Sequence, residues 1–146
     1  MSQRISKFQA LSLDQRRSLL AAFLLLPLVW IALRLFGLGR VKAWVRQIAT
    51  EPRRPVAFEE ICALGRMVNA AANHTLLPVT CLSRSVVLHC MLKQRGVFSD
   101  LRIGVRLRDS ALEAHAWVEC EGIPVNDVAD IAIQFAPFDA DLPNLA

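Results

Sequence analysis

The sequence predicts an α+β fold in which helices come first and a small antiparallel sheet follows. Apolar residues recur at helical spacing up to Gly96 and then at every second position, which is typical of strands. Short turn signals between the alternating segments favour antiparallel hairpins. The 146 residues are 54% hydrophobic and 21% charged, so we expect one buried core rather than a disordered chain.

Composition narrows the range of functions. The 17 Lys and Arg residues exceed the 13 Asp and Glu residues, but they are scattered, and the chain has no Tyr and only three separated Trp. A basic and aromatic platform for nucleic acid is therefore not expected. The four cysteines form no C-x-x-C pair and no zinc-type spacing with His, so a zinc site is not expected. Their pattern favours free thiols in a reducing, cytoplasmic compartment.

The first predicted helix carries an uncharged apolar run at residues 19–33. This run is shorter than the roughly 20 residues that cross a bilayer, so it favours a buried or interfacial helix over a spanning one. Membrane association through residues 19–33 remains an alternative. A capping-box pattern starting at Ser12 marks the helix start, Pro27 is expected to kink it, and Gly37 or Gly39 to end it.

A second short helix is predicted at residues 41–49, where apolar residues share one face. The Pro- and Arg-rich segment that follows it, 51–55, breaks the pattern. We therefore predict an N-terminal apolar helical arm at residues 1–50 and a compact core at residues 56–146. The core begins with a helix near residues 56–73.

A central helix is predicted at residues 81–94, because apolar residues cover most of its circumference. Strands follow at about 101–108 and 113–120, and a third strand starts after Gly122. The expected architecture is thus a central helix packed on a small antiparallel sheet.

Cys81 stands at the first turn of the central helix, where the helix dipole and free N–H groups favour a thiolate. The same N–H groups suit the oxyanion of an acyl-transfer intermediate. His115 lies on the second strand and is the candidate base. Arg84 and Trp117 are candidates for substrate contact. The competing interpretation is that Cys81 is only a small core residue, which is the common fate of a free cysteine.

The residue that orients His115 depends on the loop before the third strand. A three-residue loop ending at Gly122 places Asp127 directly opposite His115, within reach of its ring. A two-residue loop instead brings Asn126 onto the His115 face. Asp127 is the preferred third residue, Asn126 the alternative, and Asp130 a less favoured one.

Several linked motifs resemble one protein family. The segments C-L-S-R-S, L-K-Q-R-G-V, L-R-I-G-V-R, A-H-A-W-V-E and G-I-P-V-N-D occur in this order between residues 78 and 127. Together they resemble the leader peptidases of lasso-peptide biosynthesis, within the transglutaminase-like cysteine protease superfamily. The resemblance implies a papain- or transglutaminase-like core with Cys81 as nucleophile, His115 as general base and acid, and Asp127 as the orienting group. It also implies that no metal or organic cofactor is required.

The resemblance further implies a substrate and partners. The substrate is a ribosomally made precursor (a RiPP), from which the leader peptide is removed to free the amine of the core. The chain resembles the split form, which works with a separate leader-recognition protein and precedes an ATP-dependent lactam synthetase. Two alternatives remain: a transglutaminase-type acyl transferase with the same three residues, and a non-catalytic, membrane-associated scaffold of the biosynthetic complex.

Overall fold

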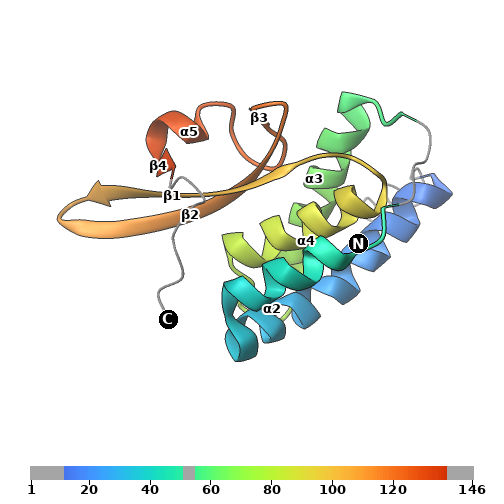
Figure 1. Ribbon diagram of the computed structural model, residues 1–146, viewed down its shortest axis with the longest axis horizontal. Helices are drawn as coiled ribbons and strands as arrows, with labels where there is room; N and C mark the ends of the chain where they lie inside the picture. Colours follow the sequence, from blue (N-terminus) through green and yellow to red (C-terminus); the bar gives the residue numbers. More distant parts are fainter. Residues whose placement is uncertain (1–11, 51–54, 138–146) are drawn as a thin grey trace, which may run out of the picture.

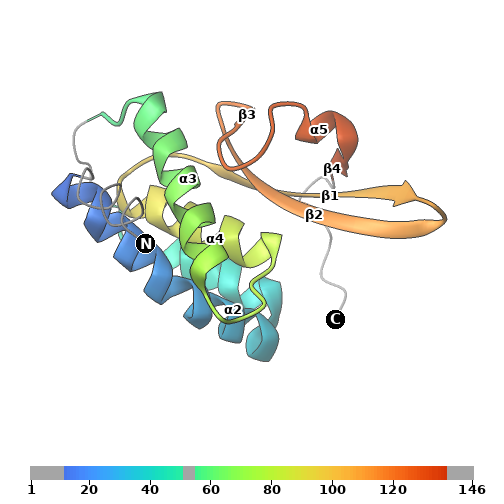
Figure 2. The ribbon, with the colours of Figure 1, turned by 180° about the vertical axis from the view of Figure 1, so that it is seen from behind.

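The computed structural model describes residues 12–50 and 55–137. Three helices form one layer, and a four-stranded antiparallel sheet of order β3-β2-β1-β4 lies against it (Figure 1). The view from behind shows the β1–β2 hairpin extending beyond the helices (Figure 2). The predicted α+β class is confirmed.

Helix α2 (Leu13–Gln47) consists of two segments that meet at Gly37. Its start is the predicted capping box: the Ser12 side chain accepts from the Gln15 backbone at 3.2 Å, and the Gln15 side chain accepts in return at 2.9 Å. Helical backbone angles continue through Pro27, where a kink was expected. Gly37 instead adopts φ 75° and ψ 168°, and the chain turns back on itself there (Figure 1). The left-handed φ explains why glycine is needed at this turn.

The helical layer is completed by α3 (Phe58–His74) and α4 (Cys81–Gln94). Ala22 and Leu26 of α2 are fully buried in the same cluster as the core residues of α3 and α4. The division of the chain near residues 51–55 stays a prediction, but α2 is part of the core in space.

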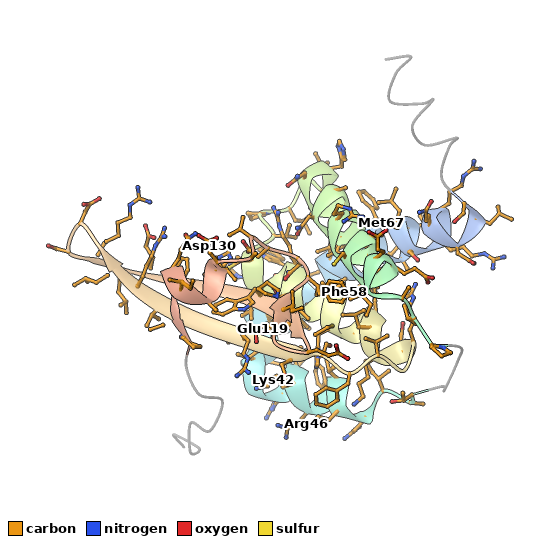
Figure 3. The ribbon with its side chains drawn as sticks, turned by 90° about the horizontal axis from the view of Figure 1, so that it is seen from above. Lys42, Arg46, Phe58, Met67, Glu119 and Asp130 are labelled. Carbon is orange, nitrogen blue, oxygen red and sulfur yellow. The ribbon has the colours of Figure 1, made fainter. Side chains whose placement is uncertain are left out.

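The opposite face of α2 is apolar and exposed. Leu20, Leu28 and Leu35 are 60%, 62% and 70% exposed. Lys42 and Arg46 project outward from the second segment of the helix (Figure 3). By length and composition this helix is either a membrane span or a core helix.

Strands β1 (Asp100–Arg108) and β2 (Ala111–Cys120) form a long hairpin. Its turn residues, Asp109 and Ser110, both have positive φ, 49° and 65°, the signature of a tight hairpin turn. The sequence predicted that alternate apolar residues of β1 would be buried up to the turn. Leu107 is instead 74% exposed, because the hairpin tip extends beyond the helices.

Strand β3 (Ile123–Pro124) follows β2 through the two residues Glu121 and Gly122, which have φ 53° and 78°. The register places Glu119 opposite Pro124. The preferred three-residue loop was therefore wrong. Two consecutive positive φ values form a type I′ turn, whose twist matches the flanking strands and needs only two residues.

The outer face of the sheet is covered by the end of the described chain. Helix α5 (Ile131–Gln134) and strand β4 (Ala136–Pro137) bring Phe135 against the fully buried Trp117. Gly104 of β1 is required beneath them, since an added Cβ would lie 2.9 Å from the Phe135 Cβ and 2.9 Å from a ring carbon of Trp117. This small aromatic cluster supports the strand that carries His115.

Candidate functional site

Cys81 is the first residue of α4, and Thr80 caps the helix. The Thr80 hydroxyl accepts from the backbone N–H of Ser83 at 3.3 Å, and the first backbone bond runs from Arg84 N to Thr80 O at 3.1 Å. Within the described chain, this leaves the N–H groups of Cys81 and Leu82 without an acceptor. The thiol is half-buried and therefore stands beside two free donors at the positive end of a helix.

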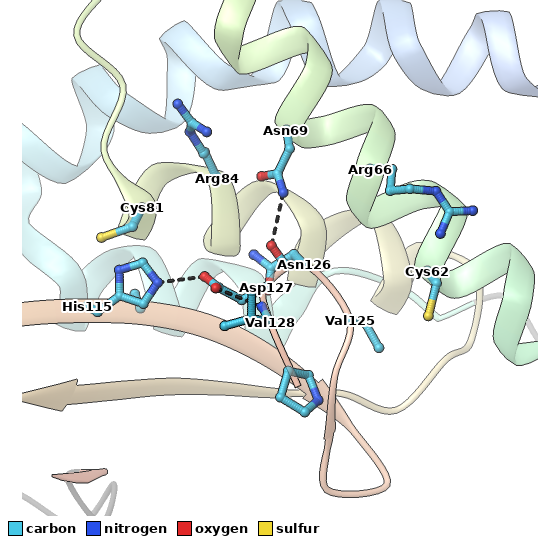
Figure 4. Close-up of a pocket in the computed structure, with 12 residues that line it drawn as sticks. Cys62, Arg66, Asn69, Cys81, Arg84, His115, Val125, Asn126, Asp127 and Val128 are labelled. Atoms are coloured by element: carbon cyan, nitrogen blue, oxygen red, sulfur yellow. Dashed lines mark hydrogen bonds and ion pairs between the residues drawn. The ribbon is translucent and has the colours of Figure 1, made fainter. Parts of the chain in front are cut away.

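His115 and Asp127 form a close pair. Nε2 of His115 lies 2.6 Å from Oδ2 of Asp127, and the two side chains are 25% and 23% exposed. The other carboxylate oxygen accepts from the N–H of Val128 at 2.8 Å. Since a carboxylate only accepts, Nε2 donates to Asp127 and Nδ1 is left for another partner. Figure 4 shows Nδ1 on the side of the ring that faces Cys81, with no hydrogen bond between thiol and ring.

Two aromatic rings fix the orientation of His115. Phe135 stacks on it at 5.1 Å between ring centres, and Trp117 at 6.3 Å. Trp117, expected from the sequence to contact substrate, does not line the groove. Its side chain is fully buried, and its Nε1 donates to Glu119 at 2.7 Å, so it supports the site from behind.

Asp127 reaches His115 because the chain leaves the sheet before it. The last ladder bond of this segment runs from Val125 N to Val118 O, at 2.9 Å. The side chain of Asn126 then takes the next position in the ladder, since its Oδ1 accepts from Val118 N at 2.8 Å. Asn126 thus points into the protein and Asp127 contacts the ring. The structure places Asp127, not Asn126, beside His115.

A buried polar network joins this segment to α4. Asn126 Nδ2 donates to Ser85 Oγ at 3.1 Å, and Ser85 Oγ donates to Ala116 O at 3.0 Å. From α3, Asn69 Nδ2 donates to Asn126 O at 2.9 Å. Ser85 lies one turn after Cys81, so the network ties the helix of the thiol to the strand of the imidazole.

The three candidate residues line one groove of about 760 Å³. Arg84 and Arg66 lie on its helical side, and Cys62 at its far end (Figure 4). Asp130, the less favoured alternative, does not line the groove, and its carboxylate accepts from Gln134. Among the described residues, no group of three or more His, Cys, Asp or Glu is placed to hold a metal ion.

Comparison with protein-family models assigns residues 24–138 to the transglutaminase-like superfamily. The chain belongs to this superfamily. Its members are usually cysteine-dependent enzymes with protease or acyltransferase activity. Comparisons with curated proteins and with solved structures gave no match. The superfamily match begins within α2 and spans the other helices, the hairpin and the 125–127 segment, and so includes every residue of the groove.

Two other thiols are distinguished from Cys81 by burial. Cys90 and Cys120 are buried, and desolvation of the charged form raises the pKa of each thiol to about 11. Both are therefore unreactive structural residues near neutral pH. His89 is also structural: its Nδ1 lies 2.8 Å from Ser99 Oγ, and burial lowers its pKa.

Sequence reasoning missed three residues that build this superfamily site. Gly65 of α3 lies so close to the Val125 carbonyl that an added Cβ would be 2.2 Å from its oxygen. Ser85 and Asn69 supply the polar ties described above. The available signals were a glycine within an amphipathic helix and a serine one turn after Cys81, and neither identifies its partner without the fold.

Proposed function

We propose that this chain is a cysteine peptidase that removes the leader from a ribosomally made lasso-peptide precursor. The observation that carries the proposal is the 2.6 Å His115–Asp127 pair in the groove that Cys81 lines from the start of α4. Membership of the superfamily supports a cysteine-dependent reaction. The order and spacing of the sequence motifs support the lasso-precursor substrate.

The arrangement suits a two-step hydrolysis. The Cys81 thiol gives its proton to Nδ1 of His115 after rotation of the side chain toward the ring, and the thiolate attacks the scissile carbonyl carbon. The N–H groups of Cys81 and Leu82 stabilise the resulting oxyanion. Nδ1 then protonates the leaving amine, and the C–N bond breaks to leave a thioester. Asp127 holds the ring through Nε2 and stabilises its charged form.

Water completes the reaction by attacking the thioester while His115 accepts a proton. The leader leaves with a new carboxylate, and the thiol is restored. The core peptide has already left with a free N-terminal amine. This is the group that an ATP-dependent lactam synthetase requires, so we place that enzyme after this one and a separate leader-recognition protein beside it.

We further propose that the enzyme works in the cytoplasm at a membrane surface. All four cysteines are free thiols, which agrees with a reducing compartment. The exposed leucines of α2 form an apolar face, and Lys42 and Arg46 suit anionic headgroups. Co-sedimentation with vesicles containing phosphatidylserine tests this: binding that persists after Leu24→Asp and Leu28→Asp would contradict it.

The decisive experiment for the peptidase is cleavage of a synthetic precursor, with and without the recognition protein, followed by mass spectrometry. Cys81→Ala is expected to fold and to abolish cleavage. Cys62→Ala is the matched control, because Cys62 lines the same groove away from the helix start, and it is expected to retain cleavage. Full cleavage by folded Cys81→Ala would overturn the proposal.

Acyl transfer to an amine is the second candidate, favoured by the superfamily match, which fits either activity. The same thioester would then be attacked by an amine rather than water. Mass spectrometry separates the two reactions, because hydrolysis yields two shorter peptides and transfer yields a product joined to the amine donor.

A further inference from the structure

We propose that Arg84 and Arg66 form an anion-binding subsite that selects peptides with an acidic side chain close to the cleaved bond. The choice of a peptide as the ligand rests on the proposed function. The choice of a negative charge rests on the groove itself, whose lining carries two guanidinium groups and a single carboxylate, Asp127.

The carboxylate does not neutralise these cations. Both oxygens of Asp127 are occupied, one by His115 and the other by the N–H of Val128. Arg84 and Arg66 have no hydrogen bond or ion pair with any described residue. Arg84 is half-buried and Arg66 is exposed, so both guanidinium groups at the edge of the groove are available to a ligand that binds there.

The arginines of the hairpin behave differently. Two of them are matched by a carboxylate on the facing strand: Arg102 with Glu119 at 3.0 Å and Arg106 with Glu113 at 2.6 Å. Arg108 lies 3.9 Å from Asp109 at the tip. Among these described arginines, the fold thus pairs those on the sheet and leaves the groove pair open.

The distances of Arg84 and Arg66 from Cys81 determine which residue of a bound peptide each arginine contacts. Arg84 follows Cys81 by three residues on α4, so the two side chains share a helix face and differ by about 4.5 Å along its axis. Arg66 projects from α3 toward the end of the groove near Cys62 (Figure 4). An extended peptide advances about 3.3 Å per residue. Arg84 therefore contacts a residue within about two of the cleaved bond, and Arg66 contacts one farther away.

Guanidinium groups suit this role because their planar donors bind a carboxylate in a two-pronged geometry. The groove has a volume of about 760 Å³ and is lined by residues of α3, α4 and the 124–128 segment, so it has room for a peptide side chain rather than only a small free anion. Free inorganic phosphate is then expected to compete only weakly.

The first test needs no natural substrate. Iodoacetate and iodoacetamide both alkylate a thiolate with loss of iodide, and they differ mainly in charge. Because the same thiolate attacks both reagents, the ratio of their rates at Cys81 cancels any change in thiol ionisation. Peptide mapping by mass spectrometry assigns the modification to Cys81. Cys90 and Cys120, with raised pKa values, are expected to remain unmodified in the folded protein.

We expect the iodoacetate-to-iodoacetamide ratio to fall about three- to ten-fold in Arg84→Gln, as for one charge removed at close range in a partly aqueous site. Arg84→Lys keeps the charge and is expected to keep the ratio. Arg108→Gln, at the hairpin tip, is the matched control and should leave the ratio unchanged. An equal ratio in wild type and folded Arg84→Gln, or an equal loss in Arg108→Gln, would overturn the proposal.

The second test concerns the peptide. Paired precursor peptides carry Asp or Asn at each position within three residues of the cleaved bond, and their binding to Cys81→Ala is measured by fluorescence anisotropy. One Asp peptide is expected to bind several-fold more tightly, and Arg84→Gln or Arg66→Gln should remove the difference. Equal affinities for the paired Asp and Asn peptides would refute the subsite even if cleavage occurs. Charge-dependent binding without cleavage refutes the peptidase and leaves the subsite standing.

Discussion

Gly65→Ala is the substitution that most directly tests how the site is assembled. Gly65 lies on α3, away from the three candidate residues in sequence, and its Cα faces the backbone that carries Asp127. An added Cβ would lie 2.2 Å from the Val125 oxygen and 3.3 Å from the Asn126 Cα. Ordinary contact begins at 3.4 Å, so the separation must grow by about 1.2 Å. Because the obstructing atom is backbone, either α3 or the 125–127 segment has to move.

The cost in stability is modest and the cost in activity is large. Alanine gains up to about 1 kcal/mol over glycine in a helix, while overpacking costs about 1–3 kcal/mol. We therefore expect a net loss of roughly 0–3 kcal/mol, which lowers the unfolding midpoint by a few degrees or more for a domain of this size. Displacing a catalytic group by about 1 Å costs on the order of 10²-fold in rate. The loss should appear in kcat more than in KM.

The assay is precursor cleavage at a temperature where circular dichroism shows both proteins folded. Gly39→Ala is the matched control, because an added Cβ there meets nothing within 4 Å and the residue lies in the second segment of α2. It should be neutral or slightly stabilising, with unchanged activity. Gly65→Ala with activity within about threefold of wild type would show that the 125–127 segment does not depend on this contact.

Three further predictions concern the residues around the site. Asp127→Ala should lower kcat at least about 10²-fold with little change in the unfolding midpoint, since it removes the group that holds the imidazole. An unchanged kcat would exclude a role for Asp127 in orienting His115. Asn126→Ala should lower both kcat and stability, by about 1–3 kcal/mol in urea unfolding, because it leaves buried partners unsatisfied; a loss of kcat alone would contradict the bridging role. The free energy of unfolding should also fall as pH rises from about 9 to about 11, because Cys90 and Cys120 stay protonated in the folded protein while the unfolded chain releases protons from ordinary thiols. Replacing both cysteines by Ala should flatten this pH dependence. An unchanged slope in the double variant would refute the assignment of the pH dependence to these two thiols.

The fold class followed from the sequence because local patterns carried it. The capping box at Ser12 and the alternation after Gly96 each depend on a few neighbouring residues. The position at which α2 is interrupted, Gly37, did not follow from local sequence. Pro27 and Gly37 both signal interruptions, but only the way α2 packs against α4 decides that the chain turns at the glycine. Burial of alternate residues in β1 failed at Leu107 for the same reason, since the extent of the helical layer is a tertiary property.

The sequence predicts the candidate residues of the site, but not the backbone path that brings Asp127 to His115. Local sequence context predicts Cys81 and His115 as candidate residues, and the structure brings both to one groove. Asp127 was selected from a hairpin register that is wrong, yet it contacts His115 at 2.6 Å. The two-residue turn alone would have favoured Asn126. Asn126 would face His115 only if the ladder continued, but the ladder ends at Val125 and a side chain replaces the next backbone bond.

The Asn126 side chain, by replacing a backbone hydrogen bond of the ladder, determines where Asp127 lies. If β3 continued as a regular strand, residue 127 would be held by backbone hydrogen bonds at a position set by β2 alone. Because Asn126 uses its side chain to bond Val118 and Ser85, the position of Asp127 depends on α4 as well as on β2. Asn69 and Gly65 add α3 to the same contact. The nucleophile helix, the strand of the base and the orienting carboxylate are therefore joined to one another through the hydrogen bonds of Asn126, so that a change in α3 or α4 at these contacts would also move Asp127.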